Sequence, residues 1–543
     1  MLALVYANRL KAGLDMIIAE TQTGFMKKRH ISSNIRLILD VLDYANEVNT
    51  EAVILFLDFY KAFDTIEHNF RFQSLKVFGF GNNFVDIVCM FYRDIYSSVL
   101  INLNTSKRFQ INRGVRQGCP ISPFLFLLVT ELLSISIVNN EKFEGISIFG
   151  RELQISQLAD DTTLFLKDKN QLLNIIILIN QFSHASGLRL NVSKCEILSL
   201  HNSNDSTIEN IPVKTCVKYL GIFVTKDLTA RQHLNFANRL KKTKSIFNTW
   251  LQRDLSVLGR VLLSKAEGLS RLVYPALSLF VSEPTTTQVN TFFLDFIWKN
   301  KSHKLKKHVL SNSKAEGGLE VLDFIDTVNT FKVNWLRKCL RNPDSIWFFI
   351  PNHIFNKIGG LFFLLKCNFL PNRLPIKLSK FHQQTLLAWK LAFVHNFSPH
   401  KAFLWNNSNI LIRNKSLFLP KWFERGIIHI LHLFDNAGNM LSYEHFMSVH
   451  SFPVLSREFI NVTRAIPIEL IQLIKSHLSY SEYKTSQPVL MLNGIELTDR
   501  RCNNKHIRQC FQRMNRVVPR GKFYWRSQIE DINWRRAWLL PHK

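Results

Sequence analysis

The run AVILFLDF, residues 52–59, is the feature that most restricts how this chain can fold. Its apolar residues are continuous rather than alternating, and the run is shorter than a typical helix. A run of this kind predicts a strand that is buried on both faces in the middle of a sheet. Asp58 stands at its far end, so we expect a carboxylate at the edge of that sheet.

A second apolar stretch, LADDTTLFL at residues 158–166, contains the adjacent carboxylates Asp160 and Asp161. Its flanks predict two short strands, and we expect a hairpin although the Asn-Gly or Asp-Gly pair of a tight turn is missing. If Asp58 lies on a neighbouring strand, carboxylates about 4 Å apart repel by about 4 kcal/mol at an effective dielectric near 20. Such a cluster must be protonated, solvated or neutralised by cations.

Oxygen-only ligands suit Mg²⁺, which usually takes one or two protein carboxylates and leaves its other positions to water and substrate phosphates. Two such ions about 3.5–4 Å apart can hold the attacking and leaving oxygens of a phosphoryl transfer. Taken alone, however, a double Asp at a turn is more often a solvated turn. The hairpin by itself therefore leaves both interpretations open.

Three helices are expected around these strands. Apolar residues recur at helical spacing over residues 34–48, and residues 64–81 read as a helix that ends at its glycines. A third apolar stripe covers residues 120–138, with Ser122 as the expected N-cap and Pro123 at the first helical position.

The chain is strongly basic. Lys and Arg outnumber Asp and Glu by 69 to 41, which gives a net charge of +28. This surplus favours a nucleic-acid partner over a membrane surface, although a merely basic surface would give the same count. Between residues 226 and 320 there are 16 Lys or Arg against 7 Asp or Glu, mostly in helical patterns. We therefore expect a separate basic helical domain there.

The eight cysteines form no CxxC pair and no dense framework, which favours a reducing compartment. The N-terminal apolar run has no basic residues before it, and no segment reaches about 18 uncharged apolar residues. These features predict an intracellular location, in the nucleus or the cytoplasm, without secretion or membrane spanning.

Five stretches of the chain resemble the palm blocks of reverse transcriptases in their order and approximate spacing. The resemblance is closest to the LINE-type, non-LTR retrotransposon group, and residues 7–25 and 296–324 resemble flanking parts of the same group. The five stretches are LFLDFYKAFDTIEH (55–68), INRGVRQGCPISPFLF (111–126), LADD (158–161), SGLRLNVSKCEIL (186–198) and KYLGIF (218–223).

The resemblance implies an α+β right-hand polymerase fold. It implies partial fingers and a palm with an antiparallel sheet over residues 1–225, a basic helical thumb over 226–330, and an α-rich C-terminal nucleic-acid-binding region over 331–543. The family's upstream endonuclease and the Arg-Pro-Ile-Ser segment of its fingers have no match here. We therefore expect a fragment that begins inside the fingers.

The activity implied is RNA-directed DNA polymerase. A primer 3′-oxygen would attack the α-phosphate of a dNTP, so the partners implied are an RNA template, a DNA primer and dNTPs, with no membrane. By the same resemblance, Asp58 and Asp160 bind two Mg²⁺ ions, or Mn²⁺ in their place, and Asp161 completes the acidic set. Phe63 matches the bulky gate that leaves no room for a ribose 2′-hydroxyl, although a core Phe is the other interpretation.

The resemblance also implies roles around the nucleotide and the primer. Gln117 and Gly118 match the block that meets the incoming nucleotide or template base, and Lys194 matches a lysine near the leaving pyrophosphate. The family's primer grip corresponds to Tyr219, Leu220 and Gly221.

Two alternatives remain. A catalytically silent retrotransposon remnant that only binds nucleic acid would share the basic charge and the motifs. An RNA-templated RNA polymerase would share the acidic pair, but it predicts a small or polar residue at the position of Phe63. Primer extension with and without the Asp160→Asn substitution separates the first alternative from an active polymerase.

Overall fold

The structure is a computed structural model, which describes residues 1–48, 50–201, 205–393, 402–477 and 489–514. The chain divides into two compact units. Unit 1 comprises Met1–Arg231 and Ser345–Trp347, and unit 2 comprises Gln232–Asp344 and Phe348–Lys543. All the site residues predicted from the sequence belong to unit 1.

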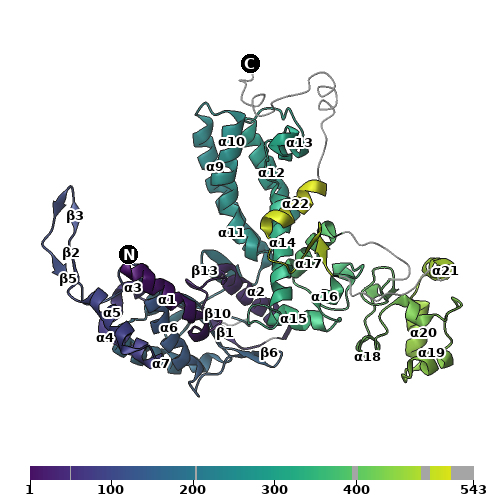
Figure 1. Cartoon of the computed structure of the whole chain (residues 1–543), viewed down its shortest axis with the longest axis horizontal. Coiled ribbons are helices and arrows are strands. Elements are labelled where there is room, and N and C mark those ends of the chain that lie inside the picture. The colour runs from purple at the N-terminus through teal and green to yellow at the C-terminus, as the bar shows by residue number, and fades with distance from the viewer. Residues whose placement is uncertain (49, 202–204, 394–401, 478–488, 515–543) are drawn as a thin grey trace. The chain divides into compact units, whose positions relative to one another are not determined.

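A six-stranded sheet in the order β11-β12-β10-β1-β9-β8 forms the centre of unit 1 (Figure 1). Strand β1 is central, and all five of its residues are buried, which confirms the interpretation of the apolar run. The strands are β1 (Val53–Leu57), β8 (Ile155–Leu158), β9 (Asp161–Leu166), β10 (Glu196–Ser199), β11 (Thr207–Ile208) and β12 (Ile211–Lys214).

We expected an antiparallel sheet, but the sheet contains one parallel pair of strands. Strand β1 pairs antiparallel with both β9 and β10, but β10 and β12 run parallel. The reason is the connection between them, because the chain returns to the starting end of β10 before β12 begins.

Two helices, α6 (Ser122–Val138) and α7 (Leu172–Ser186), cover one face of the sheet. Leu55 of β1 and Leu164 of β9 lie in one buried cluster with side chains of both helices. Successive side chains of a strand point to opposite faces, so alternate residues of β1 enter this core. Each fully buried aliphatic side chain contributes roughly 1.5–3 kcal/mol. The cluster therefore holds the sheet rigidly beneath its strand ends.

The helices expected from the sequence are present, with two differences. Helix α2 (Ile31–Val48) is confirmed. Residues 64–81 do not form a single helix, because the Glu67 N–H donates to the Ser186 carbonyl (2.8 Å) and separates α3 (Ala62–Thr65) from α4 (His68–Val77).

The second difference concerns Ser122, which is the first residue of α6 and not its N-cap. Ile121 occupies the cap position, and the structure shows no side-chain cap there. The Ser122 hydroxyl instead forms a hydrogen bond with the Tyr92 hydroxyl (3.0 Å), so a tertiary contact replaces the local one.

The rest of unit 1 consists of helices and short hairpins. The helices are α1 (Leu2–Ile17), α5 (Asn82–Tyr92) and α8 (Leu228–Gln232), the last of which crosses the boundary between the units. The hairpins are β6–β7 (Ile146–Ile148, Arg151–Leu153), β13–β14 (Cys216–Tyr219, Ile222–Thr225), and a ribbon of β2 (Tyr96–Ser97), β3 (Leu100–Ile101), β4 (Asn104–Thr105) and β5 (Phe109–Gln110).

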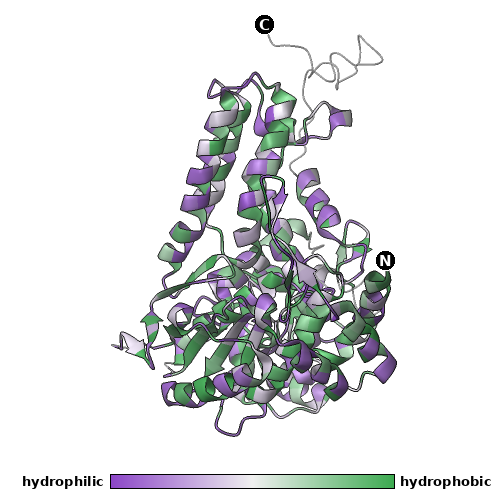
Figure 2. Ribbon diagram, turned by 90° about the vertical axis from the view of Figure 1, so that its left-hand side faces the viewer, coloured by the Kyte–Doolittle hydropathy of each residue, from purple (hydrophilic) through white to green (hydrophobic). Residues whose placement is uncertain are grey.

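Unit 2 is predominantly helical, as the fold class predicted, and its helices carry alternating hydrophilic and hydrophobic residues (Figure 2). Residue 330, where we expected the thumb to end, lies inside α14, so one helix continues through that position. Its helices include α9 (Asn238–Leu251), α10 (Val257–Leu263), α11 (Ser270–Ser278), α12 (Glu283–Ile297), α14 (Phe324–Arg341) and α17 (Lys380–Ala392).

Further helices and hairpins of unit 2 lie in the described ranges. They are α13 (Lys307–Ser311), α15 (Phe349–Asn356), α16 (Leu361–Leu364), α18 (Pro420–Glu424), α19 (Tyr443–His450), α20 (Ser456–Arg464), α21 (Ile468–His477), α22 (Asn504–Met514), β15–β16 (Leu411–Ile412, Lys415–Ser416) and β17–β18 (Met491–Leu492, Ile495–Glu496). No helix in the described ranges is both long and apolar enough to span a bilayer.

Candidate active site

The sheet brings the three predicted aspartates to one end of two neighbouring strands. Strands β1 and β9 are antiparallel with Leu57 opposite Thr162, and continuing that register by one residue places Asp58 beside Asp161. Asp160 belongs to the turn between β8 and β9, which confirms the predicted hairpin. The carboxylates are distant in sequence, and strand pairing alone makes them neighbours.

The three carboxylates repel one another. Loss of solvation raises the pKa of Asp161 to about 6, with further contributions from Asp160 and then Asp58, although Asp161 keeps an exposed surface. Burial also raises the pKa of the half-buried Asp160, and Asp58 raises it further. Within the described residues, no Lys or Arg offsets either shift. Among those residues, no basic side chain therefore offsets the negative charge of the cluster.

This donor set fits a hard divalent cation. It offers only carboxylate oxygens, and it carries a negative charge that a cation would neutralise. Among the residues that the structure describes, no three potential ligands already surround a common point. A Mg²⁺ site completed by water and substrate phosphates needs only one or two protein carboxylates, so the open arrangement suits that ion.

Asn191 fixes the position of Asp58 and was not identified from the sequence. Its Nδ2 donates to Asp58 Oδ2 (3.0 Å), and its backbone N–H donates to the Asp58 carbonyl (2.8 Å). The Lys194 N–H in turn donates to the Asn191 carbonyl (3.0 Å). Lys194 is exposed, and this short turn attaches it to the segment that holds Asp58.

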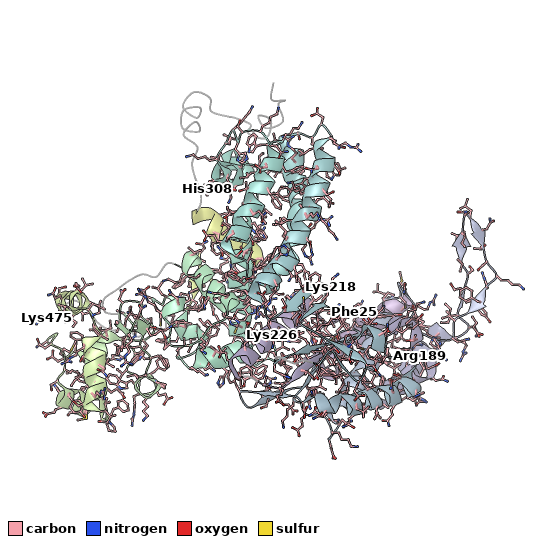
Figure 3. All side chains as sticks on the ribbon, turned by 180° about the vertical axis from the view of Figure 1, so that it is seen from behind. Phe25, Arg189, Lys218, Lys226, His308 and Lys475 are labelled. Atoms are coloured by element: carbon pink, nitrogen blue, oxygen red, sulfur yellow. The ribbon has the colours of Figure 1, made fainter. Side chains whose placement is uncertain are left out.

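Phe63, the predicted gate, is half-buried and is not enclosed in the core. Its ring stacks on Phe126 of α6, with centroids 4.0 Å apart, and meets the ring of Phe25 edge-on at 6.2 Å. Phe25, labelled in Figure 3, is 48% exposed. The core helix therefore supports Phe63 from one side, which holds the ring in a defined orientation at the surface.

The loop that carries Gln117 is held against α3. Gly114 has φ +83°, and a Cβ added there would lie 2.8 Å from the Cα of Asp64, so only glycine fits. The N–H of the next residue donates to the Phe63 carbonyl (2.8 Å). Gln117 and Gly118 follow and are both exposed. The loop thus presents the Gln117 amide beside the segment that carries Phe63.

The hairpin β13–β14 lies on the same side of the sheet as the carboxylates. Its turn consists of Leu220 (φ +46°) and Gly221 (φ +76°). The Tyr219 ring packs on Phe56 of β1, with centroids 5.1 Å apart. Because side chains alternate along a strand, Phe56 and Asp58 project from the same face. This hairpin, marked by Lys218 in Figure 3, therefore borders the acidic site.

Gln22 is the most important residue that sequence reasoning missed. Its buried side chain spans the turn of the β8–β9 hairpin, since the Ala159 N–H donates to Gln22 Oε1 (2.7 Å) and Gln22 Nε2 donates to the Ala159 carbonyl (3.1 Å). Ala159 has φ +57°, a conformation that is unfavourable for a residue with a Cβ. Gln22 thus replaces the missing Asn-Gly turn signal with a tertiary clamp.

The chain around Gln22 is adapted to this close approach. Its Oε1 also accepts from the Gly24 N–H (2.8 Å), and a Cβ on Gly24 would lie 2.4 Å from the Ala159 nitrogen. Thr23 donates its hydroxyl to the Gln157 carbonyl (3.0 Å) in β8. In the sequence, the only sign of this clamp is a glutamine directly before Thr-Gly, and the sequence does not show that this glutamine contacts Ala159.

Binding of divalent metal is expected to strengthen as the pH rises from about 5 to about 7. With a pKa of about 6, Asp161 is largely protonated at the lower pH, and a metal ligand must be ionised. The folded state binds more protons than the unfolded state in this window, so the stability without metal falls as the pH rises. Melting temperatures with and without Mg²⁺ or Mn²⁺ at each pH measure both effects. Equal metal-induced shifts at both pH values would contradict the expectation.

Residues 1–224 match the family described as reverse transcriptase (RNA-dependent DNA polymerase). The transposon TX1 uncharacterized 149 kDa protein of Xenopus laevis is 24% identical over 87% of this chain and 37% of its own length. The R2DM Pol polyprotein of Drosophila melanogaster is 28% identical over 35% of this chain and 18% of its own length.

The RNA-directed DNA polymerase from the mobile element jockey of Drosophila melanogaster is 24% identical over 45% of this chain and 27% of its own length. The chain thus spans less than two fifths of the length of each of these three relatives. Among solved structures, the apo telomerase of Candida tropicalis matches 64% of this chain and 60% of its own, with 12% identity and a TM-score of 0.36. Residues 1–224 are therefore similar to reverse transcriptase domains, and the relatives that share this similarity are proteins of transposons and retrotransposable elements.

Proposed function

We propose that this chain is an RNA-directed DNA polymerase of a LINE-type retrotransposon. The observation that carries the proposal is the meeting of Asp58, Asp160 and Asp161 at one end of the six-stranded sheet, where their mutual repulsion is not offset by any Lys or Arg in the described part of the chain. A solvated surface turn would not bring a third carboxylate from another strand into the same cluster.

The reaction joins a primer 3′-oxygen to the α-phosphorus of a dNTP and breaks the bond to the β-phosphate, so that pyrophosphate leaves. Reverse transcriptases generally use divalent metal ions. We propose that Asp58 and Asp160 hold two Mg²⁺ ions beside Asp161, and that such ions supply electrostatic stabilisation of the charge that develops on the phosphoryl oxygens.

The other residues of the site would position the reactants. The exposed Gln117 amide and the exposed Gly118, which has φ +81°, suit contacts with the nucleotide or the template base. The hairpin with Tyr219 borders the carboxylates and suits contact with the primer end. Lys194 is exposed and offers a cation for pyrophosphate.

The charge of the chain suits the proposed ligands. An excess of Lys and Arg over residues 226–320 would bind the phosphates of an RNA/DNA hybrid. This function requires the chain to work inside the cell, in the nucleus or cytoplasm.

Primer extension on an RNA template tests the proposal. In Mg²⁺ the chain should incorporate dNTPs and reject NTPs, because the Phe63 ring occupies the space of a 2′-hydroxyl. The substitution Phe63→Ala should raise the use of NTPs relative to dNTPs by about ten- to a hundred-fold, the range expected when a pocket wall is shortened. The incorporation of each nucleotide class at a single template position measures this ratio.

The variant Phe63→Tyr is the matched control, because it keeps the ring and its stacking on Phe126. It should retain the preference for dNTPs. If Phe63→Ala loses stability but keeps the same nucleotide preference, Phe63 is a packing residue and does not act as the gate.

A further inference from the structure

A ribbon of two short ladders projects from unit 1, as Figures 1 and 3 show from opposite sides. At its base β2 pairs with β5, and at its tip β3 pairs with β4. Every residue from 98 to 110 is exposed. Two-stranded hairpins are marginally stable in water without packing support, so a ribbon this exposed is suited to a partner.

The ribbon is apolar where a solvated hairpin would be polar. Leu103 is 93% exposed and Ile101 is 65% exposed. Leu100 and Ile101 are consecutive in β3, so their side chains point to opposite faces. The apolar surface therefore surrounds the tip and does not form one flat face. The further exposed apolar residues of the ribbon are Tyr96, Val99, Leu100 and Phe109.

The turn at the tip is an unfavourable place for leucine. Asn102 (φ +48°) and Leu103 (φ +68°) both lie in the left-handed region, which is the backbone of a tight hairpin turn that Asn-Gly adopts most readily. A leucine there is strained, and its side chain lies almost wholly in water. Neither property benefits the isolated fold, which indicates that the side chain serves a contact outside the chain.

The charge of the ribbon indicates the nature of that contact. From Ile95 to Arg116 there are four Lys or Arg and no Asp or Glu. Arg113 is paired with Glu67 at the base, whereas Lys107 and Arg108 lie exposed on the ribbon itself. An apolar tip with an uncompensated positive flank complements a stack of bases bordered by phosphates.

We propose that this ribbon is a nucleic-acid wedge, in which Lys107 and Arg108 bind backbone phosphates while Leu103 and Ile101 insert between neighbouring bases. Apolar side chains can partly unstack a base step in this way. This proposal adds a binding surface to the proposed polymerase. It rests on the proposed function only because the ligand is taken to be the template–primer duplex.

Leu103→Gly is the decisive substitution. It creates an Asn-Gly turn, which relieves the strained φ and should leave the hairpin at least as stable. The test is binding of the full chain to an RNA/DNA duplex that contains 2-aminopurine, in EDTA and without dNTPs. Wild type should raise the 2-aminopurine fluorescence on binding, and Leu103→Gly should abolish the rise and weaken binding by about tenfold.

The phosphate contacts have a separate readout. The double substitution Lys107→Gln and Arg108→Gln should reduce the slope of log affinity against log salt by about 2, because each phosphate contact contributes roughly 0.9 on a duplex. Leu173→Ser is the matched control, since Leu173 is an exposed leucine (49%) on α7, away from the ribbon. It should change neither the fluorescence nor the slope.

Two results would overturn the proposal. The first is an unchanged fluorescence rise with Leu103→Gly. The second is self-association of the wild type that Leu103→Gly abolishes without any change in nucleic-acid binding, which would make the ribbon an interface between copies. Because the assay needs no catalysis, a chain that unstacks the duplex but never extends a primer would refute the polymerase function alone.

Discussion

Replacing Asp160 with Asn is expected to lower the rate of nucleotide incorporation by about a thousand-fold or more. Asn keeps the size of the side chain but removes the charge that would hold a divalent cation. Such a cation contributes several kcal/mol of transition-state stabilisation. A thousand-fold loss of rate corresponds to roughly 4 kcal/mol. The fold should not suffer. Asp160 is repelled by Asp58, so its neutralisation should raise the melting temperature in the absence of metal.

Single-turnover primer extension on an RNA template in Mg²⁺ measures this effect, with affinity for the duplex measured in parallel. Asp86→Asn is the control, because Asp86 is an exposed aspartate of α5 outside the site. Extension by Asp160→Asn at the wild-type rate would refute the metal assignment. A wild type that binds RNA but never extends a primer would establish the alternative, a silent remnant.

Gln22→Ala is expected to lower incorporation by about a hundred-fold, although Gln22 touches no proposed reactant. Its amide holds both backbone groups of Ala159, the residue directly before Asp160. Without it, the unfavourable φ of Ala159 loses its support, and the turn can move the Asp160 carboxylate. A displacement of about 1 Å at a reacting centre can cost about 10²-fold in rate.

A positioning role has a signature that general destabilisation lacks. The Mg²⁺ concentration for half-maximal rate should rise for Gln22→Ala, and Gln22→Glu should be intermediate, because it keeps the acceptor for two N–H groups and loses the donor to the Ala159 carbonyl. Gln171→Ala is the matched control, since Gln171 accepts a backbone N–H from Glu144 away from the site. If Gln22→Ala and Gln171→Ala change the Mg²⁺ requirement equally, Gln22 does not position Asp160.

Some elements follow from local chemistry and could be predicted from the sequence. The run around β1 is apolar and short, so burial in the centre of a sheet is its only stable use. The β8–β9 hairpin follows from two apolar arms with carboxylates between them. The order of the motif blocks identified the reverse transcriptase domain before any contact between them was known.

Other features depend on partners that are distant in the chain. Ser122 was expected to cap α6, but the Tyr92 hydroxyl competes for it. The parallel pairing of β10 with β12 depends on the path of the connection. Asn191 and Gln22 are ordinary polar residues in the sequence, and only their contacts with Asp58 and Ala159 distinguish them.

Local sequence patterns were enough to predict the central strand β1, the β8–β9 hairpin and helix α2, the acidic residues of the site, and a basic charge that suits a polyanion. Three features emerge only from the folded chain: Asp58 lies beside Asp161, Gln22 supports the β8–β9 turn at Ala159, and the ribbon at Leu103 is exposed to solvent. Periodicity and charge are properties of short segments, so they can be recognised before the chain folds. Register, buried hydrogen bonds and exposure arise only when distant segments pack together.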